Sequence, residues 1–257
     1  FYTYLSTLHY VMEAAAENNI PVIVLERPNP NGNRIDGPVL KEKFSSFVGL
    51  HPVPVLYGMT IGEYALMING EGWLKGGIKA DLKVIRLENY RHNDFYHLPL
   101  KPSPNLPNDL SVALYPSLAL FEGTVFSAGR GTDKQFQLYG APDYVNHAFS
   151  FVPQTREGAK QPKHQGKRCY GVDLSAVELQ RVRASQKMNL SYLLDAYRNY
   201  PDKAGFFLKN NFFDRLAGSD KLRLQILAGK SENEIRAGWD ADLDAFKKRR
   251  AKYLLYP

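Results

Sequence analysis

The segment Pro21-Val22-Ile23-Val24-Leu25-Glu26-Arg27-Pro28-Asn29-Pro30 gives the clearest indication of the fold class of this 257-residue chain. Its first five residues form a short apolar run, which is typical of a strand buried on both faces of a parallel sheet. Residues 3–19, just before it, carry apolar side chains at helical spacing and predict an amphipathic helix. Polar residues follow the strand at its carboxyl end, where open α/β sheets place ligand sites. This order predicts half of a parallel α/β layer.

The same alternation continues to about residue 95. Val53-Pro54-Val55-Leu56 is a further candidate strand, although its prolines allow only an edge position or a loop. Thr60-Ile61-Gly62-Glu63 has the spacing of a capping box and predicts a helix to about residue 69. Residues 82–87 are the next predicted strand. Helices that alternate with strands predict a parallel sheet flanked by helices, so the fold class is α/β.

A proline-rich passage over residues 98–107 separates this layer from the rest of the chain. Because it cannot form regular structure, it predicts a domain crossover, with domains at 1–98 and 99–257. The strands expected after it are residues 117–121, 135–139 and 168–174. The helices expected are 190–199, 220–228 and 232–253, the last of which opens with a second capping-box spacing at Ser231.

Composition and motifs exclude several function classes. No apolar run approaches the roughly 18 residues of a membrane span, so no span is predicted. The single cysteine, Cys169, excludes an intramolecular disulfide and a thiolate zinc cluster, and a buried structural thiol is expected. The six histidines show no compact ligand spacing, so no metal site is predicted. No P-loop, dinucleotide-binding or nucleic-acid-binding motif is present, so neither a cofactor nor a nucleic-acid partner is expected.

The net charge of +7 is unevenly distributed along the chain. Residues 1–150 hold 12 Lys and Arg against 14 Asp and Glu, whereas residues 151–257 hold 21 against 12. The basic part could meet a polyanion, or its charges could simply form solvated helix faces. Its densest cluster, Lys247-Lys248-Arg249-Arg250, ends a predicted helix, where cations favourably meet the helix dipole.

The glycine-rich passage over residues 115–132 carries the most chemistry. Its glycines can turn backbone N–H groups toward an anion around Ser127, Arg130 and Thr132. Arg130 could hold a carboxylate by two parallel hydrogen bonds. Glu122 could be an acid, a base or an acceptor for a sugar hydroxyl. The alternative is a turn in which Glu122 and Arg130 pair with each other.

Three other segments offer polar candidates. Two prolines could present Arg27 and Asn29 rigidly to a ligand, although a stiff loop with a Glu26–Arg27 pair would explain them equally well. Glu63 could face a ligand, or the capping box could account for it entirely. Asn105, fixed among prolines, could be a hydrogen-bonding clamp or part of a plain linker.

These segments together carry a family resemblance. The chain contains, in order, Phe1-Tyr-Thr-Tyr4, Leu25-Glu-Arg-Pro-Asn-Pro30, Tyr57-Gly-Met-Thr-Ile-Gly-Glu63, Pro102-Ser-Pro-Asn-Leu-Pro107, Phe121-Glu-Gly-Thr124 and Gly129-Arg-Gly-Thr132. This ordered set resembles the bacterial exo-β-N-acetylmuramidase NamZ family over nearly the whole chain.

The resemblance implies a fold and an activity. The expected fold is a Rossmann-like N-terminal domain and a smaller α/β C-terminal domain, with the site in the cleft between them. The expected reaction releases N-acetylmuramic acid from the non-reducing ends of peptidoglycan fragments, and the substrate implies a periplasmic or exported location. Members of the family carry a Glu-His-Gly motif ahead of the Phe-Tyr-Thr-Tyr segment, and its glutamate is a leading catalytic candidate. That motif is not in this sequence, so we expect an N-terminally truncated chain, with the missing segment as a candidate partner.

The resemblance also suggests roles for the residues above. Glu122 and Glu63 would be the cleft carboxylates that assist the upstream glutamate, and Arg130 would hold the lactyl carboxylate of the muramic residue. The substrate-binding residues are expected to be Tyr4, Arg27, Asn29, Asn105, Ser127, Arg130 and Thr132. Two other functions stay open: a non-catalytic protein that binds cell-wall glycan or muropeptide, and a polyanion binder that uses the basic C-terminal part.

Overall fold

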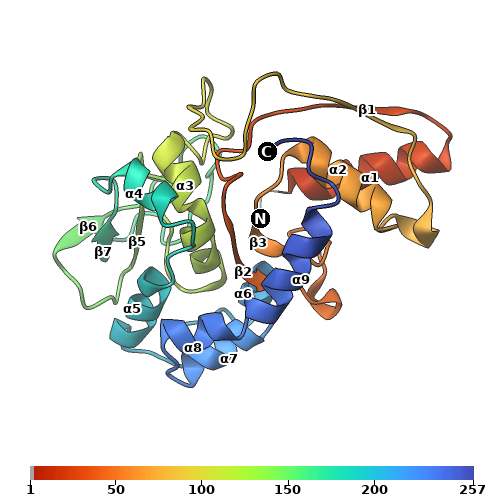
Figure 1. The fold of residues 1–257 in the computed structure, drawn as a ribbon. Coiled ribbons are helices and arrows are strands. Elements are labelled where there is room, and N and C mark those ends of the chain that lie inside the picture. The colour runs from red at the N-terminus through yellow and green to blue at the C-terminus, as the bar shows by residue number, and fades with distance from the viewer. Residues whose placement is uncertain (1–2) are drawn as a thin grey trace.

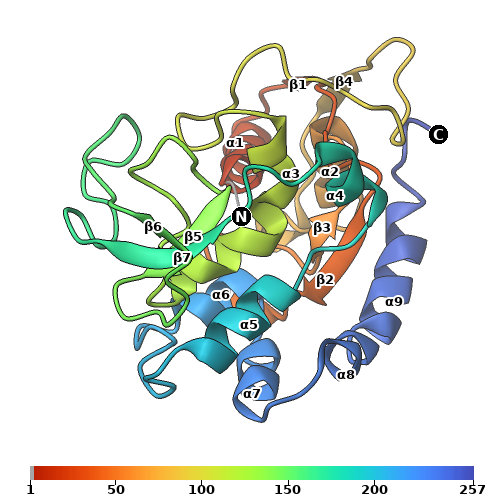
Figure 2. The same cartoon turned by 90° about the vertical axis from the view of Figure 1, so that its left-hand side faces the viewer.

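The strands form small, separate sheets (Figures 1 and 2). The structure is a computed structural model and describes residues 3–257. The first two residues of the Phe1-Tyr-Thr-Tyr4 motif lie outside the described residues. The strands are β1 (Val22–Leu25), β2 (Ile35–Val39), β3 (Pro54–Tyr57), β4 (Leu82–Ile85), β5 (Leu138–Ala141), β6 (Phe149–Phe151) and β7 (Cys169–Asp173). The helices are α1 (Tyr4–Glu17), α2 (Ile61–Gly70), α3 (Asp109–Leu118), α4 (Leu179–Ala184), α5 (Ser191–Asn199), α6 (Phe212–Ala217), α7 (Lys221–Leu227), α8 (Glu232–Ala237) and α9 (Asp240–Arg250), and the 3₁₀ helices are η1 (Glu42–Phe44), η2 (Lys75–Gly77) and η3 (Ala119–Gly123).

The α/β layer predicted from the first 95 residues is confirmed. β1 pairs in parallel with β4, from Val22 opposite Leu82 to Leu25 opposite Ile85. Helix α2 packs on this sheet, and α1 packs on α2. The expectation that β1 is buried on both faces is wrong, because Ile23 and Leu25 are 61% and 59% exposed. Within residues 3–257, only one face of this sheet is covered.

A second sheet consists of β2 and β3, which pair antiparallel. The strand at residues 53–56 is therefore real, but it does not join the parallel sheet. β2 was not predicted, because its sequence Ile-Asp-Gly-Pro-Val contains three residues that are depleted in strands.

The predicted strand at residues 117–121 is wrong. These residues are the end of α3 and the beginning of η3. Asn108 starts α3 with a capping box, in which its Oδ1 accepts a hydrogen bond of 2.9 Å from the amide of Ser111. Leu118, Leu120 and Phe121 are all completely buried. A helix buried on every side shows no amphipathic period, so its apolar run resembles a strand.

The predictions for the C-terminal part hold in outline. β7 confirms the strand at 168–174, and β5 lies a few residues after the strand expected at 135–139. β5, β7 and β6 form an antiparallel sheet in that order. The mainly helical ending is confirmed, but the helix expected at 232–253 is divided into α8 and α9 between Ala237 and Asp240.

The described residues form two hydrophobic cores, and each core draws side chains from both halves of the chain. One core gathers around Phe121, Phe126 and Phe206, and the other around Met12 and Met67. Phe246 of α9 belongs to the second core, so the C-terminal helix returns to the N-terminal domain, where Figure 1 shows it (blue) near α2 and β3 (orange). The result is a two-domain mixed α/β structure whose C-terminus is packed against its first half. None of the helices within residues 3–257 has the length and apolar character needed to cross a membrane.

Candidate functional site

A cleft of about 660 Å³ opens where the loop after β1, the end of β3, helix α3 and the proline-rich passage meet. Pockets that hold small molecules usually measure roughly 300–1,000 Å³. The polar or aromatic residues that line it are Tyr4, Arg27, Asn29, Asn31, Tyr57, Tyr96, Lys101 and Tyr115. The loop after β1 lies at the carboxyl end of the parallel pair, as the sequence predicts for a ligand site.

The lining has a distinct chemical character. Apart from its tyrosines and two asparagines it is mostly apolar, and it includes Leu98, Leu100 and Pro102 of the proline-rich passage. Arg27 and Lys101 supply positive charge, whereas none of the described lining residues is Asp or Glu. Such a surface suits a ligand that combines a flat apolar face, hydroxyl groups and a negative charge.

Three of the predicted substrate-binding residues, Tyr4, Arg27 and Asn29, lie together in this cleft. Asn29 is held in place, because its Nδ2 donates to the carbonyl of Met59 at 2.8 Å and its Oδ1 accepts from the amide of Asn31 at 2.9 Å. Arg27 is exposed and donates one hydrogen bond of 2.8 Å to the backbone carbonyl of Glu26.

The Glu26 carboxylate takes no part in that contact. It is buried and accepts hydrogen bonds from the Thr60 hydroxyl and from the amide of Gly62, the latter at 2.5 Å. Glu26 therefore holds the N-terminus of α2 against the end of β1. Arg27 is left at the surface of the cleft.

Glu122 and Arg130 form an ion pair with each other, as the alternative interpretation expects. Arg130 Nε lies 2.5 Å from Glu122 Oε1, and both side chains are partly exposed. The guanidinium of Arg130 lies 5.1 Å from the ring centroid of Phe136, whose ring lies 4.7 Å from that of Tyr115. Because Tyr115 lines the cleft, the pair lies outside the lining but is connected to it through Phe136.

Ser127, Thr132 and Asn105 also lie outside the cleft lining. The Ser127 hydroxyl accepts from the amide of Gly129 at 3.2 Å, and the Thr132 hydroxyl donates to the carbonyl of Gly129 at 2.7 Å. Asn105 is buried and donates to the carbonyl of Gly158 at 2.8 Å. These three contacts are made within and between loops of the C-terminal domain.

Lys163 supports the segment that carries Glu122 and was not among the sequence predictions. Its ammonium group donates to the carbonyls of Thr124 at 2.5 Å and Phe126 at 2.9 Å, just past the end of η3. Burial lowers its pKa to about 8. In sequence it is one lysine of a basic stretch, and no local signal distinguishes it.

Glu63 lies in the protein interior, outside the cleft lining, and is 0% exposed. It closes the capping box of α2, with Oε2 accepting from the amide of Thr60 at 2.9 Å. Its Oε1 accepts from the amide of Leu255 at 2.8 Å and contacts His92 Nε2 at 2.9 Å. Burial raises its pKa, but the hydrogen bonds from His92, Leu255 and Thr60 outweigh burial and lower the pKa overall. The carboxylate therefore anchors the C-terminal tail to the start of α2.

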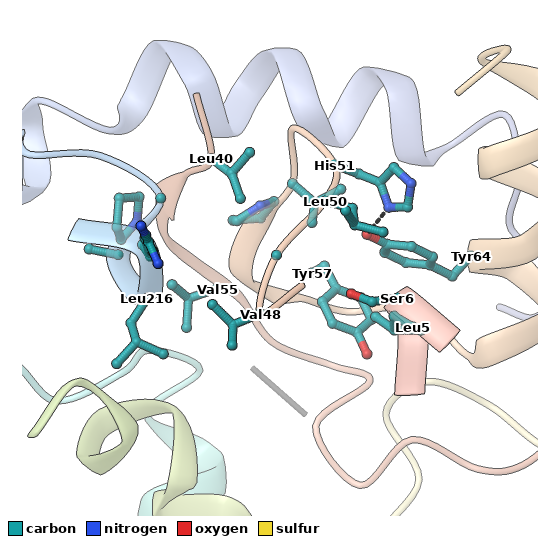
Figure 3. A pocket seen from close by; sticks show the side chains of 17 residues that line it. Leu5, Ser6, Leu40, Val48, Leu50, His51, Val55, Tyr57, Tyr64 and Leu216 are labelled. Atoms are coloured by element: carbon teal, nitrogen blue, oxygen red, sulfur yellow. Dashed lines mark hydrogen bonds between the residues drawn. The ribbon is translucent and has the colours of Figure 1, made fainter. Parts of the chain in front are cut away.

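A smaller pocket of about 60 Å³ lies beside the cleft, between β3, the start of α1 and the end of α6 (Figure 3). Tyr57 lines both hollows. The pocket holds His51, whose Nδ1 lies 3.1 Å from the hydroxyl of Tyr64, the contact dashed in Figure 3. No group of three or more metal-ligating side chains occurs among residues 3–257.

Most side chains of the basic cluster that ends α9 are engaged in contacts with other residues of the protein. Arg249 pairs with Glu71 at 3.2 Å, and Arg250 donates to the carbonyl of Gly58 at 2.8 Å. Lys247 pairs with Asp244 at 3.1 Å. These contacts favour a structural role for the cluster over a polyanion site.

Comparisons with known proteins agree with this architecture. Residues 1–110 match the family model "Exo-beta-N-acetylmuramidase NamZ, N-terminal", and residues 113–256 match "Exo-beta-N-acetylmuramidase NamZ, C-terminal". The peptidoglycan beta-N-acetylmuramidase NamZ of Bacillus subtilis (strain 168) is 40% identical over 278 residues, which cover 100% of this chain and 64% of that protein. The chain thus spans less than two thirds of the length of this curated relative.

Two solved structures of DUF1343 family proteins from Bacteroides fragilis NCTC 9343 share the fold. One superposes with a TM-score of 0.95 at 46% identity, over 100% of this chain and 72% of that chain. The other gives a TM-score of 0.82 at 28% identity, over 99% and 71%. With both of its halves matched, the chain belongs to the exo-β-N-acetylmuramidase NamZ family.

Proposed function

We propose that this chain is the main part of a glycoside hydrolase that releases N-acetylmuramic acid from the non-reducing ends of peptidoglycan fragments. The observation that carries the proposal is the 40% identity to the B. subtilis enzyme over the whole chain, because both domains that build the cleft are included. The cleft supports it independently: tyrosines and asparagines suit a sugar, and the two cations suit the acidic lactyl group of a muramic residue.

The described residues account for substrate binding more clearly than for catalysis of glycoside hydrolysis. Glycoside hydrolysis needs a group that protonates the leaving oxygen and a second that assists attack at the anomeric carbon, and the acetamido group of the substrate can supply the latter. No described lining residue is a carboxylic acid, and Glu122, which is partly exposed, lies outside the lining. We therefore propose that Glu122 assists a principal acid supplied by the additional part of the family's chain, with Tyr4, Arg27 and Asn29 binding the sugar.

We propose that this additional part packs on the uncovered face of the β1–β4 sheet. Ile23, Leu25 and Ile85 are exposed on it, although parallel sheets are normally covered on both faces. Leu25 also lines the cleft, so a segment packed on this face would border the site. The B. subtilis relative has 36% of its length outside the match, since 64% is covered.

The test is hydrolysis of a chromogenic N-acetylmuramide by the natural gene product and by residues 1–257 alone. We expect turnover by the former and little or none by the latter, with activity restored when the remaining segment is added. Binding of N-acetylmuramic acid without turnover by the natural gene product would instead establish the alternative, a non-catalytic glycan-binding protein.

The part played by Glu122 is tested in the same assay. Glu122→Gln in the natural gene product should lower kcat by roughly 100-fold or more if the carboxylate takes part in proton transfer. Glu17→Gln, an exposed substitution at the end of α1, is the matched control. Unchanged turnover of Glu122→Gln would remove this residue from the chemistry.

The proposed substrate also implies where the protein acts. Peptidoglycan lies outside the cytoplasm, so we propose a periplasmic or exported protein. Cell fractionation followed by immunodetection would check this, and recovery of the protein only with the cytoplasmic fraction would contradict it.

A further inference from the structure

Two cations from different segments of the chain line the cleft, and their surroundings leave both charges largely uncompensated. Arg27 comes from the loop after β1, and its guanidinium makes no ion pair among the described residues. Lys101 comes from the proline-rich passage. Its Nζ lies 3.8 Å from Glu157 Oε2, but the Glu157 side chain is 79% exposed. Such a long contact in solvent is strongly screened.

Arg130, the arginine that the sequence suggests for the lactyl carboxylate, already has an acidic partner. Glu122 already engages its guanidinium through two oxygens, at 2.5 and 3.3 Å. A substrate carboxylate would have to displace Glu122 before it could use the same donors. Lys101 presents no such obstacle, because it lines the cleft directly.

The backbone around Lys101 is suited to presenting a side chain. Pro99 and Pro102 fix the chain on both sides, and a residue that precedes proline is restricted to extended conformations. Leu100, Pro99 and Pro102 line the cleft beside Lys101. A preorganised segment loses less conformational entropy when it binds a ligand.

Resting on the proposed function, we infer that Lys101, which lines the same cleft as Arg27, binds the lactyl carboxylate and sets the preference for muramic over glucosamine residues. Arg27, from the loop after β1, contributes a second positive charge to the same cleft. A glucosamine residue has a hydroxyl in place of the lactyl ether, so it gains nothing from the two cations. The discrimination therefore comes from charge, in a cleft whose described lining contains no acid.

The experiment compares two chromogenic substrates, N-acetylmuramide and N-acetylglucosaminide, with the natural gene product and its variants. Lys101→Gln should lose roughly 10- to 100-fold in kcat/KM on the muramide, mostly through KM, with little change on the glucosaminide. Lys101→Arg should keep most of the preference, because the charge is retained. Lys221→Gln, at an exposed position on α7, should behave like wild type.

A binding measurement separates this inference from the proposed function. Calorimetric titration with free N-acetylmuramic acid should show tighter binding to wild type than to Lys101→Gln, and the difference should shrink at high salt. Equal losses on the two substrates, or equal binding by wild type and variant, would overturn the role of Lys101 while leaving the muramidase intact. If wild type neither binds nor cleaves the muramic compounds, the proposed function and this inference fall together.

Discussion

At the scale of single residues, a chain of buried polar groups beside the cleft shows how tertiary contacts set protonation. His51 uses both ring nitrogens, with Nδ1 3.1 Å from the Tyr64 hydroxyl and Nε2 3.0 Å from His9 Nδ1. Its ring also stacks on Trp73, with centroids 4.7 Å apart. Burial, and secondarily the neighbouring His9, lower the pKa of His51 to about 3. The ring is therefore neutral at physiological pH.

This shift predicts a loss of stability in mild acid. The unfolded chain binds a proton near the ordinary pKa of 6.5, whereas the folded chain resists it to about 3. Stability from this group is complete above pH 6.5, and each unit below costs up to about 1.4 kcal/mol of unfolding free energy. In His51→Gln, stability at pH 7.5 should fall, but its decline toward pH 5 should be smaller than in wild type. Parallel pH profiles of the melting temperature would show that His51 is not responsible.

Glu63 gives a second prediction at this scale. Glu63→Gln should lower the unfolding free energy by about 1–3 kcal/mol, because a buried amide cannot accept all the hydrogen bonds that the carboxylate accepts. It should also increase proteolysis of the tail that contains Leu255, whose amide it binds. Glu234→Gln is the matched control, since Glu234 holds the same capping-box position in α8 but is solvent-exposed. Similar losses in the two variants would show that only the cap matters.

At the scale of elements, η3 packs closely against α6 because the residue at the contact, Gly123, is a glycine and has no side chain. A Cβ on Gly123 would lie 2.4 Å from Phe213 Cα and 2.6 Å from its nitrogen, both backbone atoms. The two elements are thus in direct backbone contact, which brings the Glu122 segment against the helical C-terminal part.

Gly123→Ala should therefore destabilise the protein by about 1–3 kcal/mol, because backbone must move to admit the methyl group. Gly238→Ala is the control: its φ of −72° is helical, and a Cβ there meets only Ile235 O at 3.3 Å and the flexible Gln225 at 3.5 Å. Urea denaturation measures both variants. If both variants lose the same free energy of unfolding, the close packing of η3 on α6 does not account for the effect.

At the scale of the whole molecule, an ion pair joins distant parts of the chain. Asp36 in β2 accepts from Arg236 Nη1 of α8 at 3.0 and 2.8 Å and from the amide of Met188 at 2.9 Å. Both side chains are mostly buried. Together with Phe246, which packs in the second core, this pair holds the two domains that form the cleft in a fixed relation.

Asp36→Asn should lower the unfolding free energy by about 3 kcal/mol, because the mostly buried Arg236 then keeps only the more exposed Glu232 as an acidic partner. Asp195→Asn removes an exposed pair with Arg198 and should cost less than about 1 kcal/mol. Chemical denaturation followed by tryptophan fluorescence gives both values. A small effect of Asp36→Asn would mean that domain association does not depend on this pair.

Much of the fold could be predicted from local patterns. The capping boxes at Thr60 and Ser231, the short apolar strand at residues 22–25 and the proline-rich passage each act over a few residues, so their neighbours in sequence suffice to specify them. The apolar run at 117–121 shows where local patterns fail, because a strand and a fully buried helix have the same pattern of apolar residues over so short a length.

The site could be predicted only in part, for a related reason. Sequence patterns alone show that Arg27 and Asn29 follow the carboxyl end of a strand, and that the family's ordered motifs are present. The folded chain is needed to show that Glu63 is buried in the interior, that Glu122 pairs with Arg130 and that Lys101 lines the cleft. Residue type fixes what a side chain can do, whereas its partners come from residues far away in the chain, and those partners decide which of its possible roles it has.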